Sequence, residues 1–288
     1  MLNLKSDNLI VPNPDKLNNL VEKFQEQGTA NIHVLADFDR TLTNCFVNGE
    51  KITSIIAILR KEGYLNEEYT KVTTDLFDKY HPIEIDPQIP AEEKKQKMDE
   101  WWRAHNDELI KHGLNKDHLD KVIASSKIQF RAGALEFLDI LKQQQIPVVI
   151  MSSSGLGNYV ITRLLKKQNK MTAGVHIISN QMEFDEQGTV IGFSEPIIHV
   201  LNKDETILAD FPAYEQVKNR KNVILLGDNI EDVGMVAGFE YDNLIKIGFL
   251  NDKVDELADQ YKENFDLIIT NDSNMNIINE LLNQFNNK

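Results

Sequence analysis

The chain is short of cysteine, of positive charge and of long apolar runs. Its 288 residues include one cysteine, Cys45, so an intramolecular disulfide is impossible, which fits a reducing compartment. Lys and Arg number 31 against 45 Asp and Glu, which gives a formal net charge of −14. A surface this acidic repels phosphate backbones and anionic lipid, so we expect no nucleic-acid partner and no membrane partner.

No stretch of the sequence is apolar for long enough to span a bilayer. The first eleven residues contain Lys5 and Asp7 without a continuous apolar segment, which is not the pattern of a secretory signal. We therefore expect a cytoplasmic protein, with a monomer favoured. Hydrophobic residues make up 41% of the chain, as is typical of a globular protein, and its 288 residues are enough for about two domains.

Six short apolar runs with little polar alternation predict strands that are buried on both faces. They cover residues 32–36, 147–151, 175–178, 222–226, 244–247 and 266–269. Helical patterns separate several of these runs, for example at 158–167 and 252–261, and another helix is expected before the first run, between Asn13 and Gly28. This alternation indicates an α/β fold, a Rossmann-like parallel sheet with helices on both faces.

Residues 47–128 interrupt the alternation of strands and helices. This stretch is polar and mostly helical in pattern, with helices predicted at 51–61, 66–80 and 91–112 and a proline-rich bend at 81–87. We predict an inserted α-helical cap domain at 47–128, which leaves 1–46 and 129–288 as the catalytic core. Further along, residues 180–193 predict a β-hairpin with its turn at 185–188.

Two carboxylates stand at the end of the first predicted strand. Asp37 and Asp39 directly follow its apolar residues, and Thr41 comes two positions later. An ionised group in an apolar setting is costly, so this placement indicates a metal ion, a catalytic site or both. Asp-x-Asp also occurs in turns, where Asp side chains bind backbone amides, so the pair alone does not decide between these interpretations.

Later predicted strands also end in polar groups. These are Ser153 and Ser154 in a Ser-Gly turn, and Asp228 with Asp232, while Lys203 lies between these two segments in the sequence. The carboxyl ends of parallel strands meet at one edge of a sheet, where carboxylates can hold Mg²⁺, a serine turn before a helix can hold phosphate, and a lysine can neutralise it. Each group alone is ordinary, but the ordered set in this context predicts a phosphate-processing site.

These motifs resemble those of the haloacid dehalogenase superfamily of phosphotransferases. The similar pattern is Asp37-Phe-Asp-Arg-Thr41, followed by Ser153, Lys203 and the pair Asp228 and Asp232. Longer phrases resemble the cytosolic pyrimidine 5′-nucleotidase family of the cytosolic 5′-nucleotidase III type. They include Pro82-Ile-Glu-Ile-Asp-Pro87, His199-Val-Leu-Asn-Lys203 and Ile245-Lys-Ile-Gly-Phe-Leu-Asn-Asp252, and the resemblance covers nearly the whole chain from about residue 30.

The resemblance implies a Mg²⁺-dependent 5′-nucleotidase that hydrolyses pyrimidine nucleoside 5′-monophosphates through an aspartyl-phosphate intermediate. Asp37 would be the nucleophile, and Asp39 would protonate the departing oxygen and then activate water. Asp37, the backbone carbonyl of Asp39 and Asp228 would hold Mg²⁺. Asp232 and Thr41 would support this arrangement.

The resemblance also implies the substrate contacts. Ser153 and the amide of Ser154 would bind the phosphate, and Lys203 would neutralise it. Glu84, in the cap, would meet the exocyclic amine of a cytosine-like base. His105 lies where the family is thought to tune its choice of base.

The sequence departs from the family pattern at Asn158 and Asn229, and also in the cap after Trp101, where the changes leave the preferred base open. Trp101 and Trp102 could stack on a base, although aromatic residues in a helix more often form part of a core. Three other functions stay open: phosphoryl transfer to another nucleoside, a phosphosugar or cofactor phosphatase of the same fold, and a non-catalytic phosphate-binding protein. The intact Asp37 argues against the last of these.

Overall fold

A seven-stranded sheet forms the centre of the computed structural model, which describes residues 7–52, 54–86, 88–203, 213–237 and 240–286. The strand order is β1-β11-β10-β9-β2-β5-β6, and all neighbouring strands are parallel except β1 and β11. The strands are β1 (Leu9–Ile10), β2 (Ile32–Ala36), β5 (Val148–Ser152), β6 (Val175–Ser179), β9 (Asn222–Gly227), β10 (Asn243–Leu250) and β11 (Leu267–Thr270). The predicted α/β fold around a parallel sheet is confirmed.

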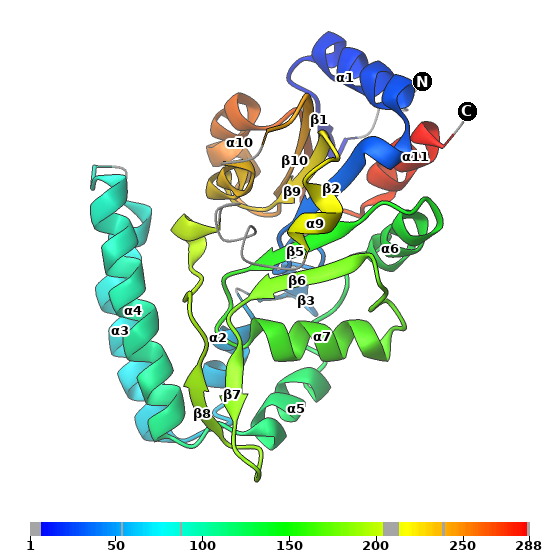
Figure 1. The fold of residues 1–288 in the computed structure, drawn as a ribbon. Helices are drawn as coiled ribbons and strands as arrows, with labels where there is room; N and C mark the ends of the chain where they lie inside the picture. Colours follow the sequence, from blue (N-terminus) through cyan, green and yellow to red (C-terminus); the bar gives the residue numbers. More distant parts are fainter. Residues whose placement is uncertain (1–6, 53, 87, 204–212, 238–239, 287–288) are drawn as a thin grey trace.

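Helices cover both faces of this sheet (Figure 1). Side chains alternate between the two faces, so that Val34 and Ala36 lie in one core and Leu35 lies in the other. The first core contains α1 (Pro14–Gln27), α6 (Ala134–Gln143), α7 (Gly157–Lys167) and α11 (Asn276–Phe285). The second contains α9 (Tyr214–Val217), η3 (Ile230–Val236) and α10 (Val254–Asn264). In the described ranges, no helix combines the length and the apolarity that crossing a membrane requires.

The predicted first helix has the expected ends. The Asn13 side chain accepts a hydrogen bond from the Lys16 N–H, and Pro14 occupies the first turn, where its missing N–H costs nothing. Gly28, with φ of +74°, ends the helix and donates its N–H to the Phe24 carbonyl. The helix then leads through a short 3₁₀ turn, η1 (Thr29–Asn31), into β2.

The region predicted as a cap is helical, as expected. A small hairpin of β3 (Phe46–Val47) and β4 (Glu50–Lys51) precedes α2 (Ile55–Lys61), α3 (Glu67–Ile85), α4 (Ala91–Lys111) and α5 (Lys116–Ala124). Helices α2 and α5 share the core that contains α7, and α3 and α4, which pack against each other beside the sheet (Figure 1), contribute Tyr69 and Leu109 to it. The division of the chain into a core and a cap at residues 47 and 128 stays a prediction.

Two predicted helix boundaries in this region are wrong. The helix expected from Lys51 begins at Ile55, because Lys51 pairs in β4. The bend expected from residue 81 begins later, because α3 continues through Pro82 to its end at Ile85. Pro82 removes one helical hydrogen bond, but only in the last turn, and in the turn before it Tyr80 stacks on Trp101 of α4 at a centroid distance of 5.9 Å.

The predicted hairpin is confirmed, and it contacts helix α4 of the region predicted as a cap. Strands β7 (Met182–Phe184) and β8 (Val190–Phe193) pair antiparallel, and Gly188 in their turn has φ of +83°. Helix α4 packs against β8 and against η2 (Val200–Asn202), the 3₁₀ turn that precedes Lys203. The α3–α4 pair is therefore anchored next to the segment that carries Lys203.

Candidate active site

The central strand β2 brings two predicted site segments to the same edge of the sheet. It pairs with β9 so that Ala36 lies opposite Leu226, and the N–H of Asp37 donates to the Leu226 carbonyl at 2.9 Å. On its other side β2 pairs with β5, after which Ser153 follows. The residues after β2, β5 and β9 converge because these strands are direct neighbours in the sheet.

Three carboxylates form a cluster at this edge. Asp37, Asp228 and Asp232 each offer an oxygen, and the three atoms lie within 4.8 Å of one another. Carboxylates this close repel each other by about 4 kcal/mol per pair at 4 Å and an effective dielectric of 20. Two side-chain cations offset part of this: Lys203 Nζ lies 2.6 Å from Asp37 Oδ1 and 2.9 Å from Asp232 Oδ1, and Arg40 Nη2 lies 3.0 Å from Asp228 Oδ2.

Asp232 shapes the turn after β9. Its Oδ2 accepts the N–H groups of Asp228 at 3.1 Å and Asn229 at 3.0 Å, while its Oδ1 accepts from Lys203. A Cβ at Gly227 would lie 2.5 Å from the Cβ of Asp232, so only glycine fits before this turn. With both oxygens engaged, Asp232 suits the supporting position that the sequence assigned to it.

The cluster is compatible with a divalent metal. Its donors are all carboxylate oxygens, which hard cations such as Mg²⁺ and Mn²⁺ prefer. Asp37 and Asp228 come from neighbouring strands and each keeps one oxygen outside the ion pairs described above. Two carboxylates with remaining oxygens match the usual protein share of a magnesium site, whose other ligands are waters and phosphate oxygens.

Burial and the two cations compete in setting the charge of the cluster. Burial raises the pKa of the Asp37 carboxyl, and the charge of Lys203 lowers it by a smaller amount. Burial likewise raises the pKa of the Asp228 carboxyl, and the charge of Arg40 lowers it by a smaller amount. Burial also lowers the pKa of the Lys203 ammonium, but Asp232 and Asp37 raise it by more, so this group stays charged. A bound cation would keep both carboxylates ionised.

Asp39 has a different environment from the other acidic residues. Its Oδ2 accepts the N–H of Ile55, at the start of α2, at 3.3 Å. Burial, and then the charge of Asp37, raises the pKa of Asp39 to about 7. A carboxyl with this pKa can both donate and accept a proton near neutral pH, which is what a general acid–base group requires.

Arg131, for which the sequence predicts no role, fixes the loop after β2. It is buried, and its guanidinium donates to the main-chain carbonyls of Arg40, Thr41, Thr43 and Ser273. Its Nη1 also lies 3.1 Å from Asp272 Oδ1. Thr41 is buried too, and its hydroxyl has no hydrogen-bond partner among the described residues. The sequence Phe130-Arg-Ala-Gly133 carries no motif that could have shown this role.

The serine turn after β5 lies against the α4 helix. The N–H of Ser154 donates to the hydroxyl of Ser152 at 3.2 Å. A Cβ at Gly155 would lie 2.8 Å from the ring of Trp102, so the turn and α4 touch at this glycine. The turn therefore lies between the sheet and α4, and phosphate binding by Ser153 and Ser154 stays a prediction.

The two predicted base-contacting residues lie on α3 and α4. Among the described residues, no hydrogen bond or ion pair links Glu84 or His105 to the acidic cluster. Glu84 Oε2 lies 2.9 Å from His81 Nδ1 in the last turn of α3. His105 Nε2 lies 2.9 Å from the Tyr69 hydroxyl, and burial lowers the pKa of His105 to about 3, so the ring is neutral.

An aromatic row runs along α4. Trp101 and Trp102 stack at a centroid distance of 6.5 Å, and Trp102 stacks on His105 at 5.7 Å. Both tryptophans are half-buried, and Trp102 packs on the first core. Trp102 therefore packs as part of a core, as aromatic residues in helices usually do. The rings of Trp101 and Trp102 are also partly exposed, so a ligand could still contact them.

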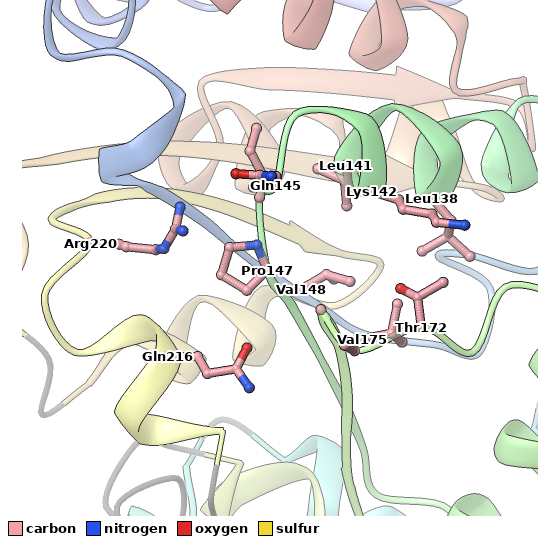
Figure 2. Close-up of a pocket in the computed structure, with 13 residues that line it drawn as sticks. Leu138, Leu141, Lys142, Gln145, Pro147, Val148, Thr172, Val175, Gln216 and Arg220 are labelled. Atoms are coloured by element: carbon pink, nitrogen blue, oxygen red, sulfur yellow. The ribbon is translucent and has the colours of Figure 1, made fainter.

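A separate cleft of about 530 Å³ lies at the opposite edge of the sheet, and its lining residues are drawn in Figure 2. Its walls include Pro147 and Val175, at the amino ends of β5 and β6, together with Leu138 of α6 and Arg220. None of its lining residues is acidic or belongs to the predicted site. The cleft is therefore unrelated to the carboxylate cluster.

The sheet and the grouping of charges at its carboxyl edge define a hydrolase with the haloacid dehalogenase-like fold. Comparison with known proteins narrows this class. The pyrimidine 5′-nucleotidase (UMPH-1) family model matches residues 40–286, and the chain belongs to this family of phosphoric monoester hydrolases. The family resemblance seen in the sequence is confirmed.

Individual relatives match over nearly their whole length. The 7-methylguanosine phosphate-specific 5′-nucleotidase A of Xenopus laevis is 33% identical over 280 residues, which cover 97% of this chain and 96% of the relative. The structure of cytosolic 5′-nucleotidase IIIB bound to cytidine superposes with a TM-score of 0.88 at 30% identity, over 98% of this chain and 95% of that one. A phosphoserine phosphatase solved as a phospho-aspartyl intermediate analogue shares the fold, with a TM-score of 0.51, 18% identity and coverage of 86% and 97%.

Proposed function

We propose that this protein is a Mg²⁺-dependent 5′-nucleotidase that hydrolyses nucleoside 5′-monophosphates through an aspartyl-phosphate on Asp37. The observation that carries the proposal is the meeting of Asp37 with Asp228, Asp232 and Lys203 at the end of β2. A carboxylate can attack a dianionic phosphate only where cations offset the repulsion between them. The cluster supplies one such cation and the oxygen ligands for another.

Asp37 and Asp228, with the main-chain carbonyl of Asp39, would hold Mg²⁺. When bound, this ion neutralises charge on the phosphoryl oxygens. Lys203, held between Asp37 and Asp232, supplies positive charge from the protein itself. Ser153 and the amide of Ser154 would bind the remaining phosphate oxygens from the turn before α7.

The proposed chemistry has two displacements at phosphorus. Asp37 forms a bond to phosphorus while the bond to the nucleoside O5′ breaks, and Asp39 donates its proton to that oxygen. Water then attacks phosphorus, Asp39 accepts its proton, and the bond to Asp37 breaks to release phosphate. Because the pKa of Asp39 is raised to about 7, the carboxyl can serve in both directions.

We propose that the preferred substrates carry a base with an amine donor, as in the pyrimidine nucleotide CMP and in 7-methyl-GMP. The solved relative was bound to cytidine, and the curated relative is named for 7-methylguanosine phosphate. Both bases present amine N–H groups that the carboxylate of Glu84 could accept, whereas uracil presents a carbonyl instead of the cytosine amine. His105, already hydrogen-bonded to Tyr69, would act on base choice through its stacking on Trp102.

A substrate panel tests this function. Phosphate release would be measured from CMP, UMP, 7-methyl-GMP and ribose 5-phosphate with Mg²⁺. We expect CMP and 7-methyl-GMP to react fastest, EDTA to stop the reaction, and Asp37→Asn to abolish it while the variant still unfolds cooperatively. A wild-type rate in Asp37→Asn would exclude Asp37 as the nucleophile, and a preference for ribose 5-phosphate would indicate a phosphosugar phosphatase.

Two further points belong to the same proposal. Adding free nucleoside as an acceptor would show whether the aspartyl-phosphate also passes its phosphoryl group to an alcohol instead of water. The solved relative is named a cytosolic 5′-nucleotidase, and we propose the cytoplasm for this chain as well.

A further inference from the structure

Arg40 places a positive charge on one of the proposed metal ligands. Its Nη2 lies 3.0 Å from Asp228 Oδ2, where 32% of the Arg40 side chain and 8% of the Asp228 side chain are exposed. Lys203 pairs with Asp37 and Asp232 instead. Among the described residues Arg40 is therefore the ion-pair partner of Asp228.

The loop fixes the backbone from which the Arg40 side chain starts. Arg40 has φ of +62°, a left-handed conformation that non-glycine residues adopt at a cost of about 1 kcal/mol or more. Its carbonyl accepts from Arg131 Nη2 at 2.5 Å and from Asn251 Nδ2 at 2.9 Å, and its N–H donates to Thr43 Oγ1 at 3.0 Å. Three hydrogen bonds thus hold residue 40 in the orientation from which its guanidinium meets Asp228.

We propose that Arg40 is a built-in competitor of the metal ion. The inference rests on the proposed function, because it takes Asp37 and Asp228 as ligands of Mg²⁺. With no metal bound, Arg40 neutralises a buried carboxylate that would otherwise be left without an ion pair. A divalent ion that binds the same carboxylate is repelled by the guanidinium, so Arg40 lowers the metal affinity of the site.

An alternative role for Arg40 is contact with the substrate phosphate, since a third of its side chain is exposed. The pairing with Asp228 favours the metal role, because the guanidinium is already bound to a ligand of the ion. The two roles differ in what they predict without substrate. Only the competitor role changes metal binding to the substrate-free protein.

The test is Mg²⁺ titration of the substrate-free protein by calorimetry, at fixed pH and ionic strength. Arg40→Met keeps much of the aliphatic side chain and the same backbone conformation but removes the charge. We expect Arg40→Met to bind Mg²⁺ roughly ten-fold or more tightly than wild type, the scale seen when groups behind metal ligands are changed. Arg40→Lys keeps the charge and should stay near wild type.

Control variants separate the possible results. Arg103, on α4, forms an exposed ion pair with Glu195. Arg103→Met also removes one positive charge and should leave the Mg²⁺ affinity unchanged. If Asp228→Asn weakens Mg²⁺ binding but Arg40→Met does not strengthen it, the metal site stands and the competitor role is overturned. If Arg40→Met raises only the KM for CMP, Arg40 is a substrate contact and the role is likewise overturned. If wild type binds no Mg²⁺ and Asp228→Asn changes nothing, the proposed function fails together with this inference.

Discussion

At the scale of single residues, Asp39 differs from the neighbouring acidic residues in the kind of group that binds its carboxylate. Asp37 and Asp228 each face a side-chain cation, whereas Asp39 accepts a main-chain N–H from Ile55. Burial and the nearby Asp37 raise the pKa of Asp39 to about 7, so much of this carboxyl is protonated at neutral pH. Burial also raises the pKa of Asp37, to about 6, so the two carboxyls differ in their bonding partners rather than in the direction of their pKa shift.

Asp39→Asn should show this division of roles through the leaving group. We expect kcat for CMP to fall by about 10²- to 10⁴-fold, because O5′ would leave without a proton. p-Nitrophenolate leaves without protonation, so the first displacement on p-nitrophenyl phosphate should change far less. Stopped-flow absorbance should then show a burst of p-nitrophenol stoichiometric with enzyme, because the second displacement still lacks its base. Equal losses on both substrates without a burst would remove Asp39 from this role.

Among the elements, the loops after β2 and β11 at the carboxyl edge are joined by Arg131 and Asp272. Arg131 donates to carbonyls in the loop after β2 and to Ser273 after β11. Asp272 pairs with Arg131 and accepts the N–H groups of Cys45 and Phe46, each at 2.8 Å, just where the chain leaves the core for β3. The catalytic loop and the start of the helical region are therefore held by one buried ion pair.

Replacing Arg131 should loosen the catalytic loop and the start of β3 together. Breaking a buried ion pair at one partner costs about 3–5 kcal/mol, so we expect Arg131→Met to lower the unfolding free energy by about that amount in urea. We also expect a lower kcat at temperatures where the variant is folded. Cys45, 1% exposed in the wild type, should react faster with a thiol reagent.

This thiol measurement has a simple control. Because Cys45 is the single cysteine, the reagent reports on this loop alone. Lys127→Met removes a partly exposed cation that pairs with Glu50 in β4, next to the same hairpin, and should leave Cys45 protected. Unchanged Cys45 reactivity and unchanged kcat in Arg131→Met would show that Arg131 does not position the loop.

The α3–α4 pair is the element that would carry base recognition. Glu84→Ala should raise the KM for CMP roughly ten- to hundred-fold, the effect of losing a hydrogen bond to a charged group. The KM for ribose 5-phosphate should change little, because this substrate has no base. Glu92→Ala, an acidic residue on α4 whose side chain is 89% exposed, is the matched control for charge. Equal changes for both substrates in Glu84→Ala would remove Glu84 from base recognition.

Strands and strand ends could be predicted from the sequence because their signals are local. A buried strand is a short apolar run in the sequence. Asp37 directly follows the last residue of β2, and Asp228 directly follows the last residue of β9. Roles could not be assigned to Arg40, although it lies within the Asp37–Thr41 motif, or to Arg131, because their partners Asp228 and Asp272 lie far along the chain. The bend expected at Pro82 was wrong for a related reason, because the local preference of proline did not reveal the packing of Tyr80 on Trp101 of the next helix, α4.

At the scale of the whole molecule, buried histidines make stability depend on pH. His33, at 0% exposure in β2, has its pKa lowered from 6.5 to about 4, chiefly by burial. Below pH 6.5 the unfolded chain binds a proton at this site that the folded chain does not, so this histidine contributes a loss of stability as the pH falls. Above pH 6.5 the contribution vanishes.

His33→Gln should isolate this effect, because the other titrating groups stay the same. The pKa difference between 6.5 and about 4 amounts to about 3 kcal/mol at 1.36 kcal/mol per pH unit, so the variant should gain up to that much relative to wild type between pH 6.5 and 4. Urea unfolding at pH 7.5, 5.5 and about 4.5 would measure the difference. A constant offset between the two proteins at every pH would contradict the assignment.

The central place of β2 has a consequence for how the protein is made. Val34 must pair with Val148 on one side and Ile224 on the other, and a ribosome delivers both partners long after β2 has emerged. Until then the apolar strand β2 has no hydrogen-bonding partner on either edge, which makes the nascent chain prone to aggregate. We therefore expect synthesis of this enzyme in cells to depend on chaperones that bind early, before residue 224 has left the exit tunnel.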